Sequence, residues 1–115
     1  MALVVTFFED SRNRLSSFVG SGHVAIPETS SDEYSLVCAA VSAILQAARL
    51  GLESVAHVDL QIHQERGDMR VGVPADRRDD PVVQAILATA ALSTQQIASQ
   101  YPQHVRFERE LEAQP

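Results

Sequence analysis

The two ends of the chain have the residue pattern of β-strands. Residues 2–8 (ALVVTFF) are β-branched and aromatic, a composition typical of a strand. A polar, turn-like stretch follows, and LSSFVGSG then predicts a second short strand that ends at two glycines. Near the other end, HVRFERE places Val105 and Phe107 on one face of a last strand. The first two strands form a predicted N-terminal hairpin.

A second hairpin is predicted in the middle of the chain, in HVDLQIHQERGDMRVGV. Apolar and polar residues alternate before and after the turn signal Gly67-Asp68, so one face of this hairpin should be buried. The residues predicted on that face are Val58, Leu60, Ile62, Met69, Val71 and Val73.

The segment LVCAAVSAILQAARLGLES predicts a helix, because its polar residues recur at intervals of four, three and four positions. This narrow polar stripe consists of Ser42, Gln46, Arg49 and Glu53. The remaining positions are apolar or small, so we expect protein to cover most of the helix. Gly51 is the candidate for its end.

A second helix is predicted to start at Asp80-Pro81 and to run to about Tyr101, where Pro102 ends it. Asp80 can accept hydrogen bonds from free amides at the helix start, and proline suits the first helical position. The predicted buried stripe of this helix is Val83, Leu87, Ala90, Thr94, Ile97 and Tyr101.

The predicted order is therefore β-β-α-β-β-α-β. It indicates an α+β fold in which an antiparallel sheet carries two helices on one face. The length of 115 residues suits one domain over residues 1–115. Residues 20–37 are polar, rich in serine and without a period, so we expect a mobile loop there. Residues 111–115 are expected to be a frayed tail.

Composition and charge restrict the class of protein. The hydrophobic content of 45% is that of a globular domain. The formal charge is −6 and the basic residues are scattered, so we expect no direct contact with nucleic acid, and a basic protein is a compatible partner. No stretch is expected to span a membrane, and no basic leader precedes the first apolar run. A single cysteine cannot form an internal disulfide, which fits a reducing cytoplasm.

Cys38 and His23 are the candidates for chemistry. Cys38 is expected in the first turn of the first helix or just before it, where free amides and the helix dipole stabilise a thiolate. The alternative is a small buried core residue. His23, between Gly22 and Val24 at the end of a strand, has room to act as a base, and its alternative is a surface residue. The residues alone leave both alternatives open.

The other polar patterns do not predict a cofactor or metal site. The three remaining histidines, His57, His63 and His104, are predicted to be surface residues. Their dispersal and the single cysteine give no zinc-binding spacing. The GSG tripeptide precedes a loop and not a helix, so it is a poor phosphate site. Asp32-Glu33 is by default a solvated acidic pair.

The combination of SGH with LVCAAVSAILQAARLGL resembles the bacterial ribosomal-processing cysteine protease family, the Prp proteases. The resemblance extends over nearly the whole chain, and VCAAVSA at residues 37–43 is its specific part. In that family a strand ends in Gly-His, a mobile loop follows, and the catalytic cysteine opens a helix. The resemblance implies that Cys38 is the nucleophile and that His23 is its base.

What the resemblance implies for function is a cytoplasmic thiol endopeptidase without a cofactor, active as a homodimer. It would remove the N-terminal extension of a large-subunit ribosomal protein, the 27th of its series, during ribosome biogenesis. His23 would deprotonate Cys38 and then protonate the leaving amine. From geometry, amides at the start of the Cys38 helix could hold the oxyanion. Gly20, Gly22 and Val24 would belong to the substrate-binding loop.

This sequence departs from the family pattern around the cysteine. The family usually has an acidic residue three positions before it, where this chain has Ser35, and Asp32 is the nearby candidate to replace that acid. The loop from His23 to Cys38 is longer, and Val24 follows the histidine where a smaller residue is usual. Ser42 is a possible supporting residue or dimer contact, with an ordinary surface serine as the alternative.

Two other functions are compatible with these residues. A non-catalytic dimeric module of the same fold could bind a ribosomal or other basic protein. A cysteine-based hydrolase or transferase could act on a different substrate.

Overall fold

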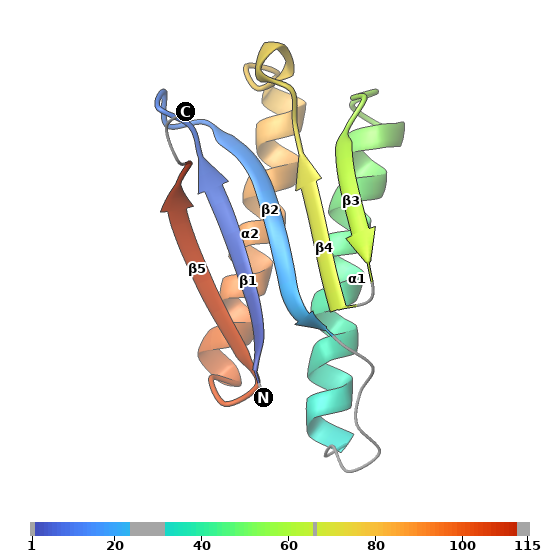
Figure 1. Cartoon of the computed structure of the whole chain (residues 1–115), viewed down its shortest axis with the longest axis vertical. Coiled ribbons are helices and arrows are strands. Elements are labelled where there is room, and N and C mark those ends of the chain that lie inside the picture. Colours follow the sequence, from blue (N-terminus) through green and yellow to red (C-terminus); the bar gives the residue numbers. More distant parts are fainter. Residues whose placement is uncertain (1, 24–31, 66, 113–115) are drawn as a thin grey trace.

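The computed structural model describes residues 2–23, 32–65 and 67–112, which form a five-stranded sheet with two helices on one face (Figure 1). The strands and helices are β1 (Leu3–Glu9), β2 (Leu15–His23), α1 (Asp32–Ser54), β3 (Gln61–Glu65), β4 (Gly67–Gly72), a short 3-10 helix (Ala75–Arg77), α2 (Pro81–Gln100) and β5 (Val105–Leu111). The α+β class and the order β-β-α-β-β-α-β are confirmed.

The strand order in the sheet is β3-β4-β2-β1-β5. Three of the pairings are antiparallel, but β5 lies parallel to β1, with Val105 opposite Leu3. The prediction of a purely antiparallel sheet is therefore wrong at β5. A helix of 20 residues spans about 30 Å, so α2 returns the chain to the end of the sheet where β1 begins. A strand starting there beside β1 has to run in the same direction.

The core lies between the sheet and the helices. Phe7 and Phe18 stack at 5.2 Å between ring centroids, and Phe107 packs on Phe7 from β5. The middle hairpin is buried as predicted on β4, at Met69 and Val71. Its other strand, β3, lies at the edge of the sheet and is exposed along its whole length. The predicted burial of Ile62 is therefore wrong.

Helix α1 starts earlier than the sequence analysis predicts. Residues 20–23 belong to β2 and residues 32–37 to α1, so the predicted loop is shorter by these ten positions. Residues 24–31 lie outside the described part of the chain. Acidic side chains favour a helix N-terminus, and Asp32 and Glu33 occupy the first turn. The predicted tail is also too long, because Leu111 belongs to β5 and the Glu112 amide donates to the Glu9 carbonyl at 2.8 Å.

The length and hydropathy of α1 would suffice to cross a membrane, contrary to the sequence expectation. The core helix of a globular protein can have the same length and hydropathy. One side of α1 packs on the sheet. The residues that it buries are Tyr34, Val37, Cys38, Val41, Leu45, Ala48 and Leu52. Its other side is open, with Leu36 71% and Leu50 60% exposed. Within one copy of the chain, the prediction that protein covers most of this helix is wrong.

Helix α2 begins as predicted. The Asp80 carboxylate accepts from the Val82 amide at 2.9 Å, and Pro81 is the first helical residue. Four residues of the predicted stripe are buried, Val83, Leu87, Ala90 and Thr94, together with Ala91, which was not predicted. The last two predicted residues, Ile97 and Tyr101, are only partly buried. Gly51 lies inside α1 and not at its end, and a Cβ there would meet Ile86 of α2 at 3.4 Å.

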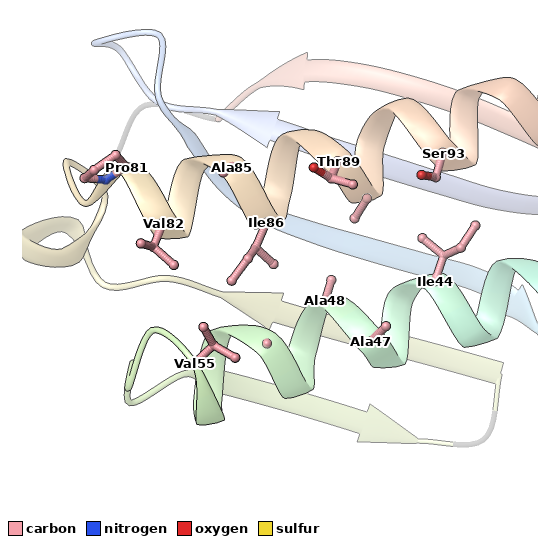
Figure 2. Close-up of a pocket in the computed structure, with 12 residues that line it drawn as sticks. Ile44, Ala47, Ala48, Val55, Pro81, Val82, Ala85, Ile86, Thr89 and Ser93 are labelled. Atoms are coloured by element: carbon pink, nitrogen blue, oxygen red, sulfur yellow. The ribbon is translucent and has the colours of Figure 1, made fainter.

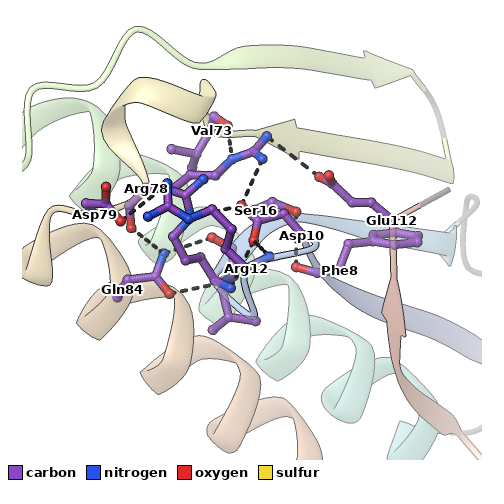
Figure 3. Close-up of polar contacts among 11 residues, drawn as sticks. Phe8, Asp10, Arg12, Ser16, Val73, Arg78, Asp79, Gln84 and Glu112 are labelled. Carbon is purple, nitrogen blue, oxygen red and sulfur yellow. Dashed lines mark hydrogen bonds and ion pairs between the residues drawn. The ribbon is translucent and has the colours of Figure 1, made fainter. Parts of the chain in front are cut away.

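A polar network joins the β1–β2 turn to the segment before α2, at the end of the sheet opposite His23 (Figures 1 and 3). The buried Asp10 accepts from the backbone amides of Arg12 and Arg14 at 2.9 and 3.1 Å. Its second oxygen accepts from Arg14 Nε at 3.0 Å and Arg78 Nη1 at 3.2 Å. Burial alone would raise the pKa of Asp10, but these hydrogen bonds lower it to about 2.

Candidate active site

The end of β2 is shaped by a glycine. The register of β2 against β4 shifts between Ser21 and His23, so Gly22 is an extra residue with a φ of 89°. A Cβ at this position would lie 2.9 Å from the Ala2 carbonyl oxygen. The backbone of His23, the last residue of β2, then pairs with Gly67. The glycine therefore sets the backbone position of the candidate base.

Replacing Gly22 with alanine is expected to lower the free energy of unfolding by about 2 kcal/mol, from positive-φ strain and the contact with Ala2. Urea denaturation measures this change. Gly72→Ala is the matched strand control, because its Cβ would meet the flexible Gln61 side chain at 3.3 Å. Equal stability of the two variants would contradict the bulge argument.

Gly20 has a packing role. A Cβ there would lie 3.0 Å from Cδ1 of Leu45, so the missing side chain lets α1 approach β2 closely. Gly20 and Gly22 both belong to β2 and not to a loop, and their contact with substrate stays a prediction. Val24, the third residue of that prediction, lies outside the described ranges.

Cys38 is the seventh residue of α1 and is 1% exposed. The prediction that it lies in the first helical turn is wrong. The free amides of a helix are those of its first four residues, which here begin at Asp32. The amide of Cys38 lies beyond them, so the suggested oxyanion site at the start of the Cys38 helix is not supported by this geometry.

Tyr34 lies one turn before Cys38 on the same buried face of α1. A hydrogen bond with the Cys38 side chain, followed by burial and by the charge of a thiolate, raises the pKa of Tyr34. The raised pKa means that the phenol keeps its proton at neutral pH.

The first turn of α1 is held against the segment that precedes β5. His104 Nε2 lies 2.7 Å from Oε2 of Glu33, and Gln103 donates to the same oxygen at 3.1 Å. The rings of Tyr34 and His104 meet edge to face at 5.5 Å. The His104 side chain is only 15% exposed, so its prediction as a surface residue is wrong. Asp32 is exposed at the first helical position.

The predicted supporting serines, Ser35 and Ser42, are both partly buried on α1. Ser42 lines a small cavity of about 50 Å³ between α1 and the ends of β2 and β4. Asp68 lines the same cavity and follows Gly67, the backbone partner of His23. Within the described ranges, Oδ1 of Asp68 is buried without a hydrogen-bond partner.

Sequence reasoning missed Tyr34, His104 and Asp68. The spacing of four between Tyr34 and Cys38 would have placed them together once Asp32-Glu33 was taken as the start of the helix. No local signal connects His104 with Glu33. Asp68 was interpreted only as part of a turn. In the described part of the chain, no group of three or more His, Cys, Asp or Glu side chains could hold a metal ion.

Comparison with known proteins identifies the family of this chain. The sequence model of the cysteine protease Prp family matches residues 3–106. The chain belongs to the cysteine protease Prp family. This membership confirms the resemblance and the enzyme class predicted from the sequence. No curated protein matches the chain.

Solved structures show the same fold as this Prp family member. SMU.848 from Streptococcus mutans superposes with a TM-score of 0.82 at 23% identity, over 97% of this chain and 100% of that one. An essential ribosomal processing protease Prp from S. aureus, in complex with a substrate peptide, gives 0.80 at 18% identity, over 93% and 98%. The S. aureus protease with a covalently linked product peptide gives 0.78 at 20% identity, over 93% and 98%.

Proposed function

We propose that this protein is a cysteine endopeptidase in which Cys38 is the nucleophile and His23 is the general base. One observation carries this assignment. The chain belongs to a family of cysteine proteases and contains a single cysteine, so Cys38 is the only thiol that the reaction could use.

The proposed reaction has two stages. His23 takes the proton of the Cys38 thiol, and the thiolate attacks the scissile carbonyl carbon of the peptide. The C–N bond breaks as His23 returns the proton to the leaving amine, which leaves an acyl group on sulfur as a thioester. Water, deprotonated by His23, then hydrolyses the thioester and regenerates the thiol. Because Cys38 is 1% exposed, the residues that cover it have to move before a peptide can reach it.

The proposed substrate is the N-terminal extension of a large-subunit ribosomal protein, the 27th of its series. Support comes from the S. aureus relative, a ribosomal processing protease crystallised with a substrate peptide. The formal charge of −6 favours association with a basic ribosomal protein. The cytoplasm, where ribosomes assemble, is the proposed location.

The direct test is to incubate the purified protein with the ribosomal protein from the same genome and to follow its intact mass. A discrete loss from the N-terminus supports the proposal and locates the cleavage site. The same substrate with its N-terminal extension deleted is the matched control and should remain uncut. An extended substrate that keeps its full mass would contradict the assignment.

A non-catalytic dimeric module of the same fold is the second candidate function. Two observations favour this function. Cys38 is buried, and Ser35 occupies the position where the family usually has an acidic residue. Such a module would bind the ribosomal protein without cutting it, and replacement of Cys38 would leave its binding unchanged.

We also propose that two copies associate through the outer face of the helices. A groove of about 660 Å³ runs between α1 and α2, away from the sheet (Figure 2). Its lining is mostly apolar and includes Ala47 and Val55 of α1 and Val82 and Ala85 of α2. Apolar surface of this kind commonly marks a protein–protein interface.

Replacing Ala47 with glutamate is expected to weaken the dimer by on the order of 100-fold, because a charge would be buried without a partner. Analytical ultracentrifugation over a range of concentrations measures the change. Leu111→Glu, at an exposed apolar position on β5, is the matched control and should leave the dimer intact. An Ala47 variant that dimerises like the wild type would exclude this face.

A further inference from the structure

We propose that the first turn of α1, residues 32–35, is a gate that has to open before a peptide can reach Cys38. The contact between Glu33 and His104 is the latch that keeps this gate closed. The inference deepens the proposed function and rests on it, because access to Cys38 matters for catalysis only if this thiol is the nucleophile.

Cys38 lies on the face of α1 that packs into the core, and it is 1% exposed. The sheet side of this core is held firmly, because β1 and β2 are inner strands and each pairs with a neighbour on both sides. The part of α1 that follows Cys38 is also held, since Val41, Leu45 and Leu52 are buried at 0 to 4% exposure. The first turn of α1 is the part that can move at the lowest cost.

This first turn covers the Cys38 side chain. Side chains on a helix lean toward its N-terminus, so the Cys38 side chain lies over the turn that precedes it. In Figure 1 the first turn of α1 extends past the ends of β2 and β4. Of residues 32–35, only Tyr34 is buried, and Asp32 and Glu33 are exposed. A helix end with so little buried surface opens easily unless other contacts hold it.

Polar contacts hold the first turn against the segment that precedes β5. Oε2 of Glu33 accepts from Gln103 Nε2 at 3.1 Å and lies 2.7 Å from His104 Nε2. A carboxylate only accepts hydrogen bonds, so His104 carries its proton on Nε2 in this contact. The Glu33 side chain is 54% exposed, and a partly exposed pair of this kind contributes little to stability. The latch is therefore weak enough to open.

The other half of the latch is fixed. The His104 carbonyl accepts from the Leu3 amide at 2.9 Å, and the His104 amide donates to the Tyr101 carbonyl at 2.9 Å. The rings of His104 and Tyr34 meet edge to face at 5.5 Å. His104 therefore stays with β1 and the end of α2 when the first turn of α1 moves away. Loss of the Glu33–His104 contact frees this turn and leaves the rest of the fold in place.

Two variants remove the latch from its two sides. Glu33→Ala removes the carboxylate, and His104→Phe keeps an aromatic ring beside Tyr34 but has no group that bonds to Glu33. Asp32→Ala is the matched control, because it removes one exposed acidic side chain from the same turn and keeps the Glu33–His104 contact. The double variant Glu33→Ala/His104→Phe should have no larger effect than either single change, because both act on one contact.

The first measurement is hydrogen exchange of the α1 backbone amides, followed by mass spectrometry. In an α-helix the amides of residues 36–39 donate to the carbonyls of residues 32–35, so they are released when the first turn opens. We expect them to exchange about fivefold faster in Glu33→Ala and His104→Phe than in Asp32→Ala, the effect of losing a partly exposed pair. Exchange at residues 45–54 should be equal in all variants, which separates this opening from a general loss of stability.

The second measurement is the rate at which iodoacetamide labels Cys38, the single thiol of the chain, in the native protein. The exposed thiol is the same group in every variant, so the ratio of rates at one pH reports the population of the open gate. We expect the labelling rate to rise about fivefold, in step with the exchange. Cleavage should show a KM that is lower by a similar factor and an unchanged kcat, because more of the enzyme is ready to bind.

The outcomes separate this inference from the proposed function. Equal exchange of residues 36–39 in Glu33→Ala and Asp32→Ala overturns the latch. Faster exchange without faster labelling overturns the gate, because the turn then does not cover Cys38. Faster labelling with an unchanged KM in an active enzyme also overturns it, because the peptide then does not wait for the gate. Faster exchange and labelling together support the inference even if the wild type cuts no ribosomal protein, in which case only the proposed function fails.

Discussion

Replacing Cys38 with alanine is expected to lower the rate of peptide cleavage by at least about 10⁴-fold, a loss typical of removing a catalytic nucleophile. The chain has no second thiol that could substitute. Affinity for the peptide should change by less than about threefold, because binding groups remain in place when only the reacting atom is removed. Single-turnover cleavage assays and fluorescence anisotropy of a labelled peptide measure the two effects.

The control for this prediction has to account for the burial of Cys38. Val37→Ala removes a neighbouring buried side chain and creates a cavity without touching the thiol. It should lower stability by about 1–2 kcal/mol and still allow cleavage. Full cleavage by Cys38→Ala would exclude this thiol as the nucleophile. Tight binding without cleavage by the wild type would identify the non-catalytic module.

Replacing Asp10 with alanine is expected to lower the free energy of unfolding by about 3 kcal/mol. The change removes four hydrogen-bond contacts and leaves Arg14 and Arg78 without this buried partner. Urea denaturation at neutral pH measures the loss. Asp59→Ala, at an exposed position, is the control and should stay within about 0.5 kcal/mol of the wild type.

The loss of stability in Asp10→Ala should also depend on pH, in a direction set by the lowered pKa of Asp10. Folding lowers the pKa of Asp10 from 3.8 to about 2, so the folded state binds this proton less readily than the unfolded chain. The stabilisation is therefore complete above pH 3.8 and disappears as the pH falls toward about 2. The difference in stability between wild type and Asp10→Ala should narrow below about pH 4. A difference that stays constant between neutral pH and pH 3 would contradict the role of the Asp10 charge.

The candidate site was only partly predictable from the sequence. The VCAAVSA motif around Cys38 identified the cysteine protease family, because the residues of this motif are contiguous in the chain. Tyr34 could have been placed next to it by helical spacing. The Glu33–His104 contact could not, because it joins residues 71 positions apart and no local pattern indicates that they meet.

The sequence by itself determined the number and order of the strands and of the two α-helices, and most of their buried faces. The start of α2 at Asp80-Pro81 is an example, since capping needs only neighbouring residues. The tertiary structure alone decided that β5 lies parallel to β1, that β3 is exposed at the edge, and that one side of α1 is open. These features depend on which elements pack together. Hydrophobic periodicity and helix capping involve residues close in the sequence, and they define where a residue lies within its own strand or helix. Strand pairing and side-chain burial depend on contacts between segments that are distant in the chain.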